Sequence, residues 1–146
     1  MTNLKTVVSV ADILEREMEP TIKDWLRRVN LVSAITVIPL SDEERTGHLP
    51  KLYSDLISRL RLPEDVQPSV SVAANAHGQL RRLQGYSAAM LIEESRMFQV
   101  ATFGALHLHQ SELDQELVLS DVMVIADEVD AQLGETVRSL TAEPAV

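Results

Sequence analysis

Cysteine is absent from all 146 residues of the chain. This absence excludes a disulfide framework, a zinc site with cysteine ligands and a thiol nucleophile. Aromatic residues make up only 3% of the sequence, and helix breakers are few, with 5 glycines and 6 prolines. Because 45% of the residues are hydrophobic, the composition favours a packed helical domain over a disordered segment.

An excess of basic residues is also lacking, since the formal net charge at pH 7 is −9. Nucleic-acid binders need a basic face to neutralise phosphates, so binding to DNA or RNA is not expected. The sequence contains no apolar run of about 18 residues, which argues against a membrane-spanning helix. A basic segment followed by an apolar core, typical of a signal peptide, is missing at the start. The sequence therefore predicts a cytoplasmic protein.

Apolar residues recur at intervals of three and four along most of the chain, which predicts helices. Ser9 is a suitable cap for a first helix, and Pro20 suits the first turn of a second one. Ser41 and Glu44 have the spacing of a capping box at the start of a further helix. The segment 31–40 is apolar and β-branched, but an isolated strand would have no partner. We therefore expect a helix end and a buried connection there.

The second half of the chain predicts longer helices. These run from Ser69 or Ser71 to about Gly85, from about Tyr86 to His109, and from Ser111 or Asp114 to about Leu140. With about six or seven helices and short links, the expected fold is an all-α globule. Residues 1–146 are expected to form one domain, a length that buries about two-thirds of the surface of the unfolded chain.

A polar stripe in the middle of the chain is the first candidate for function. His77, Arg81 and Gln84 are spaced by four and three residues, so a helix places them on one face. They either contact a ligand or signal, or serve a structural role by capping a neighbouring helix or pairing with Glu93 or Glu94. A buried and unpaired arginine is costly, so Arg81 is expected to find a partner or water.

Two glycines, Gly78 and Gly85, lie seven residues apart beside this stripe. Glycine costs a helix about 1 kcal/mol relative to alanine. Their spacing places them on one face of a helix, which predicts that another helix packs closely against that face. The junction at Gly85 is expected to be either a bend or a full break between two helices.

The last predicted helix carries a heptad pattern, with apolar or small residues at alternating steps of three and four. The positions are Leu119, Val122, Ala126, Val129, Leu133, Thr136 and Leu140. The apolar stripe narrows after about Ala126, which predicts a helix that begins in the core and leaves it to form a dimer. An ordinary amphipathic terminal helix is the alternative.

Histidines are the remaining candidates for chemistry. They are His48, His77, His107 and His109. No H-x-x-x-H or Glu-x-x-His pair occurs, so no metal site is expected. A haem ligated by one of the last three is an alternative, although few aromatic residues are available to wall a porphyrin. Phosphate-binding loops, nucleophile elbows and dinucleotide fingerprints are absent, so this chain is not expected to be an enzyme.

Three segments together resemble a known family. They are H-G-x-x-R-x-x-Q-G-Y from His77 to Tyr86, L-I-E-E-S-R-M-F-Q from Leu91 to Gln99, and D-V-M-V-I-A-D-E-V-D from Asp121 to Asp130. This pattern resembles the RsbR/RsbRD-type N-terminal sensor domain of stressosome co-antagonist proteins. Similar domains stand at the N-terminus of some bacterial sensor histidine kinases. The resemblance extends over roughly residues 11–140.

The resemblance implies a globin-like helical bundle without haem or another cofactor, usually a homodimer. Such a domain receives a signal and passes it to a C-terminal output domain, here through residues 119–140. The motif positions carried over are His77, Gly78, Arg81, Gln84, Gly85, Tyr86 and Glu94. Two other functions stay open: a haem-binding gas sensor and a structural adaptor that binds no ligand.

Overall fold

The computed structural model describes residues 7–142. Its helices are α1 (Val10–Arg16), α2 (Met18–Val29), α3 (Ser33–Thr36), α4 (Asp42–Thr46), α5 (Leu49–Leu60), α6 (Val72–Leu83), α7 (Ala88–Leu108), the short 3₁₀ helix η1 (Gln110–Glu112) and α8 (Val118–Thr141). The predicted all-α class is confirmed. The globin-like arrangement stays a prediction.

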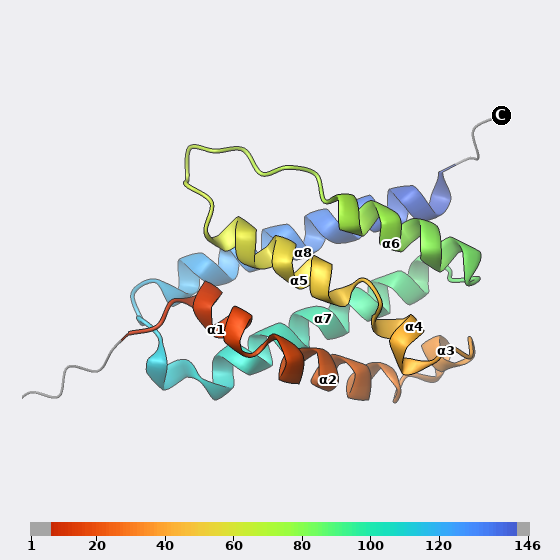
Figure 1. The fold of residues 1–146 in the computed structure, drawn as a ribbon, viewed down its shortest axis with the longest axis horizontal. Helices are drawn as coiled ribbons and strands as arrows, with labels where there is room; N and C mark the ends of the chain where they lie inside the picture. Colours follow the sequence, from red (N-terminus) through yellow and green to blue (C-terminus); the bar gives the residue numbers. More distant parts are fainter. Residues whose placement is uncertain (1–6, 143–146) are drawn as a thin grey trace, which may run out of the picture.

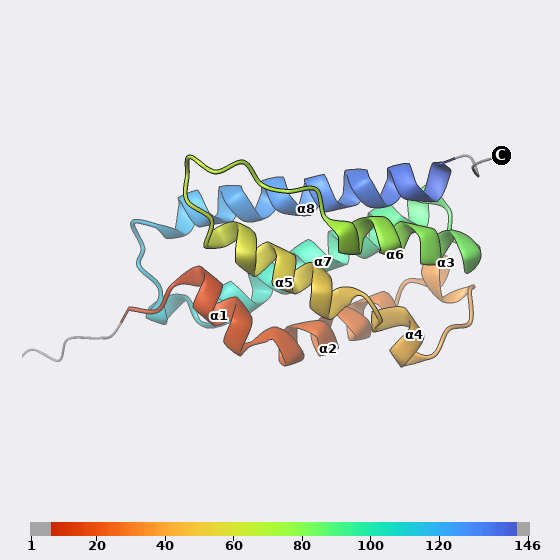
Figure 2. The ribbon, with the colours of Figure 1, turned by 45° about the horizontal axis from the view of Figure 1, so that its top comes forward.

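The helices form layers, which Figures 1 and 2 show from two directions. The long helix α8 packs against α5, α6 and α7, while α1 packs on α5 and α2 on α7. Helices α5 and α7 therefore lie between α8 on one side and the α1–α2 pair on the other. Figure 2 also shows α6 running alongside the C-terminal half of α8, and this is the most extensive helix pair of the fold.

Local sequence signals explain where several helices begin. The Ser9 hydroxyl accepts a hydrogen bond from the Asp12 amide, 3.1 Å away, and caps α1. The predicted capping box at α4 is confirmed, since Ser41 and Glu44 each bond the other's backbone amide. Pro20 lies in the first turn of α2. An N–H at this position would have no acceptor within α2, so the proline breaks no hydrogen bond of the helix.

The core is built from apolar residues on the inner faces of all these layers. Trp25 of α2 is 1% exposed, and its indole nitrogen donates to the backbone oxygen of Glu94, 3.0 Å away. Tyr53 and Thr102 bring hydroxyls into this core, but they bond each other at 2.6 Å. Buried polar groups that are paired in this way do not carry the desolvation cost of isolated ones.

Two predictions of local structure need correction. The segment 31–40 contains the short helix α3, and only part of it is buried: Ile35 is inside, whereas Val37 is 74% exposed. The last helix begins at Val118, later than predicted. The chain before it forms η1 and then an extended residue, Leu113, which makes an isolated parallel bridge with Val8. This pairing with a distant segment has no signal in the local sequence.

The prediction that α8 leaves the core after Ala126 is wrong. Of the heptad positions, Val129, Thr136 and Leu140 are buried, Val122, Ala126 and Leu133 are half-buried, and Leu119 is exposed. Polar residues of α8 are also buried because they bond the backbones of neighbouring helices. Gln132 donates to the Leu52 oxygen at 3.1 Å, and Ser139 donates to the Asn75 oxygen at 2.6 Å. The apolar stripe of α8 becomes narrower after Ala126 because small and polar residues, and not large apolar ones, pack against α5 and α6 there.

The length and apolar content of each helix decide whether it could span a membrane. Within residues 7–142, every helix is either too short or too polar to cross a bilayer.

Candidate functional site

An ion pair lies in the interior between α6 and α7. Arg81 is fully buried, and Glu94 is 4% exposed. Nε of Arg81 donates to Oε1 of Glu94 at 3.0 Å, and Nη2 donates to Oε2 at 2.9 Å. This two-pronged geometry is the strongest form of an arginine–carboxylate pair. This pair confirms the prediction from the sequence that a buried Arg81 has a partner.

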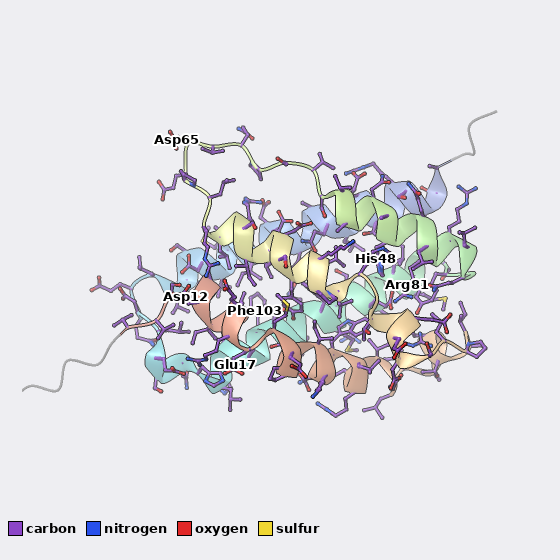
Figure 3. The ribbon with its side chains drawn as sticks, in the orientation of Figure 1. Asp12, Glu17, His48, Asp65, Arg81 and Phe103 are labelled. Carbon is purple, nitrogen blue, oxygen red and sulfur yellow. The ribbon has the colours of Figure 1, made fainter. Side chains whose placement is uncertain are left out.

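The other donors of Arg81 join α4 to this pair. Nη2 also donates to the backbone oxygen of Arg45 at 2.6 Å, and Nη1 donates to Oε1 of Gln84 at 2.7 Å. The Tyr86 ring lies beneath the guanidinium, with its centroid 4.6 Å from the central carbon Cζ. Figure 3 labels Arg81 close to His48, at the end of the bundle where α4 and α6 meet.

A second buried arginine completes the cluster. Arg45 of α4 is 3% exposed, and it donates to the Tyr86 hydroxyl at 2.7 Å and to the Ile38 oxygen at 2.7 Å. The Tyr86 hydroxyl in turn lies 3.3 Å from Oε2 of Glu94. Burial and the nearby Glu94 carboxylate raise the pKa of Tyr86 to about 12, so the phenol keeps its proton. We call Arg45, Arg81, Gln84, Tyr86 and Glu94 the arginine cluster.

Sequence reasoning missed Arg45. It follows Asp42, Glu43 and Glu44 in a five-residue helix, a context typical of a solvated surface. Its burial follows from the tertiary packing of α4 under Tyr86 and not from any local pattern.

Gly85 ends α6 and brings Tyr86 into place. Its φ is +88°, in the left-handed region that glycine adopts without strain. The Gly85 amide donates to the Arg82 oxygen at 3.1 Å, and the Tyr86 amide donates to the Arg81 oxygen at 3.0 Å. These two bonds make a Schellman cap. The predicted close packing at Gly85 is therefore wrong, since the nearest atom to an added Cβ would be Cδ1 of Ile38 at 3.9 Å.

Gly78 lies where α6 and α8 meet. A Cβ built on Gly78 would stand 2.3 Å from the Thr136 backbone oxygen and 2.8 Å from Cβ of Ser139. Cross-helix hydrogen bonds flank this contact: the Thr136 hydroxyl donates to the Ala74 oxygen at 3.2 Å, and the Asn75 amide donates to Glu135 at 2.9 Å. The glycine at position 78 therefore allows α6 and α8 to pack closely, as predicted from the sequence.

His77 lies beside the arginine cluster without a hydrogen bond to it. The residue is 6% exposed, and its Nε2 is 3.8 Å from Oε1 of Glu94, beyond hydrogen-bonding distance. Its ring meets that of His48 edge to face, with centroids 5.4 Å apart. Among the described residues, Nδ1 of neither histidine has a hydrogen-bond partner. Burial, and then the charges of His77, Lys51 and Arg81, lower the pKa of His48.

A small cavity of about 40 Å³ adjoins His77 and Glu94. Its wall comes from α2, α5, α6, α7 and α8. The lining residues are Trp25, Leu49, Leu52, His77, Leu91, Glu94, Ser95, Phe98, Val129, Gln132, Leu133 and Thr136. The wall is therefore largely apolar, with the edge of the arginine cluster at one side.

The other histidines lie elsewhere. His107 is exposed near the end of α7. His109 lies 2.9 Å from Oε2 of Glu112 and 3.3 Å from Oε1 of Glu17, on the surface near α1. In the range 7–142, histidine, aspartate and glutamate side chains form no group of three that fits a metal ion.

Most of the residues singled out in the sequence meet at one place. His77, Arg81, Gln84, Tyr86 and Glu94 come together between α6 and α7, whereas the heptad positions of α8 are dispersed between core and surface. Comparison of the chain with protein-family models, curated proteins and solved structures found no match in any of the three. The resemblance to the RsbR-type sensor domain stays a prediction.

Proposed function

We propose that this chain is a sensory domain of a bacterial signalling protein, in which the arginine cluster and the adjoining cavity receive the signal. One observation carries the proposal: a fully buried, two-pronged Arg81–Glu94 pair joins α4, α6 and α7 beside a cavity. The three resembling sequence segments support the same function. The parent protein would be a histidine kinase or a stressosome-type regulator in the cytoplasm.

Stability alone is a poor reason for such a pair. Desolvation of two charges offsets most of their attraction, and well-packed apolar residues of similar volume are often as stabilising or more so. An intact pair fixes one arrangement of three helices, whereas a disturbed pair leaves a charge buried without a partner. A cluster of this kind therefore suits an element with two discrete arrangements.

The packing of α6 offers a path from the cluster to the end of the domain. Arg81 and Gly78 are both on α6, and Gly78 contacts the α8 backbone at Thr136. A shift of α6 that accompanies a change at Arg81 must be followed by α8, because the contact leaves no free space. In the proposed parent protein, α8 leads into a C-terminal output domain.

The same proposal includes a homodimer. Val129 and Leu140 are buried within one chain, so they are inaccessible to a second copy. Leu119 and Met123, one turn apart near the start of α8, are 71% and 66% exposed. They are the exposed large apolar residues of α8, so a second copy can reach them.

Hydrogen exchange tests the sensory function in the isolated chain. Glu94→Gln removes the charge of the pair and keeps its shape, and we expect faster exchange in the last turns of α8, which contact α6 at Gly78 and Arg82, before global unfolding. Tyr53→Phe, which removes a different buried hydrogen bond, is the matched control. Exchange that rises equally in all helices of Glu94→Gln would identify a structural adaptor and contradict the proposal.

A further inference from the structure

The cavity beside His77 is lined mostly by buried residues. Ten of its twelve lining residues are buried, and the two half-buried ones are Ser95 of α7 and Leu133 of α8. The mouth of the cavity therefore lies between α7 and α8, at Ser95 and Leu133. A ligand that enters here reaches the interior without passing through the arginine cluster.

Polar groups in the wall are few and mostly occupied. The Trp25 indole donates to the Glu94 backbone, and both carboxylate oxygens of Glu94 accept from Arg81. The Thr136 hydroxyl donates within and across helices. His77 differs, because the ring is more than nine-tenths buried and makes no hydrogen bond among the described residues. A buried polar group of this kind gains from a partner supplied by a ligand.

Charge restricts the ligand to a neutral molecule. Arg81 and Glu94 already neutralise each other, Arg45 is not among the lining residues, and the rest of the wall is largely apolar. A charged ligand would lose its hydration without gaining a counter-ion, which is costly. A hydroxyl group is the best match for His77, because it bonds either tautomer of the imidazole by donating or accepting.

Size sets a further limit. One water-sized group needs about 10–15 Å³ of such space, and the cavity measures about 40 Å³. Its capacity is therefore about three or four non-hydrogen atoms. We propose that this cavity binds a small neutral molecule with a short apolar body and one hydroxyl-like group, which bonds His77. This assignment rests on the proposed sensory function and names the chemical class of its signal.

Methyl NMR titration of the full chain tests the assignment, with 1-propanol as the probe. We expect saturable shifts of the methyl groups of Leu52, Leu91 and Val129, with affinity of about millimolar for so small a ligand. Propionate and propylammonium, which have similar size but carry charge, should cause no such shifts. Shifts that do not saturate, or that propionate causes equally, would overturn the proposal.

Variants at the mouth separate binding in the cavity from binding at the surface. Leu133→Phe and Ser95→Leu narrow the mouth from α8 and from α7, and each should weaken 1-propanol binding at least tenfold. Val137→Phe, one turn further along α8 and outside the cavity wall, is the matched control and should bind as the wild type does. Unchanged binding in both mouth variants, when their spectra show a folded protein, would contradict the assignment.

The role of His77 has its own test. The ratio of the affinities for 1-propanol and 1-chloropropane, which lacks the O–H donor, should fall at least fivefold in His77→Leu. An unchanged ratio would overturn the assigned hydrogen bond.

Hydrogen exchange then distinguishes the two proposals. If 1-propanol binds but Glu94→Gln leaves the end of α8 unaffected, the cavity stands and the sensory function fails; the reverse result rejects the cavity alone.

Discussion

Gly78 of α6 and Thr136 of α8 are in backbone contact, so that a Cβ on Gly78 would stand 2.3 Å from the Thr136 oxygen. Neither partner is the end of a flexible side chain, so Gly78→Ala must push the two helices apart. We expect a loss of about 2–3 kcal/mol in the free energy of unfolding, although alanine is the better helix former. Urea unfolding followed by circular dichroism measures it.

Gly104 provides the matched control for that experiment. It lies within α7, and an added Cβ would meet nothing within 4 Å. Gly104→Ala should therefore stabilise the protein by about 0.5–1 kcal/mol through helix propensity and the unfolded chain. If both substitutions changed stability in the same direction, the close contact between α6 and α8 would be contradicted.

Gly85 is required for its backbone angle and not for space. With φ at +88°, a side chain at this position adopts a conformation that costs about 1–2 kcal/mol. We expect Gly85→Ala to lower the free energy of unfolding by that amount. Gly85→Asn should cost less, because asparagine tolerates the left-handed region. Equal losses for the two variants, measured by urea unfolding, would argue against the Schellman cap.

Arg81 and Glu94 should show strong coupling in a double-mutant cycle. Arg81→Met or Glu94→Leu alone leaves a buried charge without its partner, which costs about 3–5 kcal/mol. The double variant removes both charges, so we expect a loss well below the sum of the two. Chemical denaturation of all four proteins supplies the cycle. Additive losses would mean that the two side chains do not act as a pair.

Acid should weaken the fold partly through His48. The pKa of this imidazole is lowered in the folded protein, first by burial and then by His77, Lys51 and Arg81. The unfolded chain takes up the proton near the ordinary value of 6.5, while the folded chain resists it. Stability therefore falls as the pH drops below about 6.5, towards the lower folded-state pKa.

A histidine substitution measures this contribution. His48→Gln should flatten the dependence of the unfolding free energy on pH between about 7 and 5. His107→Gln removes an exposed imidazole of α7 and serves as the control. A wild-type slope retained in His48→Gln would show that other groups cause the pH dependence.

Substitutions on α8 should separate association from folding. We expect light scattering at tens of micromolar to find a dimer, and the double variant Leu119→Glu, Met123→Glu to be a folded monomer, because both residues are exposed. Val129→Glu places a charge in the core instead and should lower stability by at least about 3 kcal/mol. A monomeric wild type would contradict the proposed homodimer.

The local signals of this sequence predict its helices well. Capping residues such as Ser41 and Glu44 act within one turn of the helix that they start, so they are visible without tertiary structure. The polar stripe was also visible, because the regular spacing of His77, Arg81 and Gln84 follows from helix geometry alone.

Features set by distant contacts were not visible. Arg45 is buried by Tyr86, which lies 41 residues away in the sequence. The narrowing of the apolar stripe of α8 suggests a solvated helix, yet Gln132 and Ser139 are buried and bond the backbones of α5 and α6. Gly78 and Gly85 lie seven residues apart, but only Gly78 packs against another helix, because α6 ends between them and Gly85 belongs to its cap.

The cap at Gly85 has a consequence for how this protein can vary in evolution. Arg81 contributes its carbonyl to the cap and its guanidinium to the pair with Glu94, and Tyr86 contacts both parts of it. One inserted or deleted residue between Arg81 and Tyr86 would break the cap and carry the Tyr86 ring away from the guanidinium. Descendants of this sequence can exchange an exposed side chain such as Leu83 in that stretch, but they must conserve Gly85 and the length of the stretch, whereas the exposed segment 63–70 is free to grow or shrink.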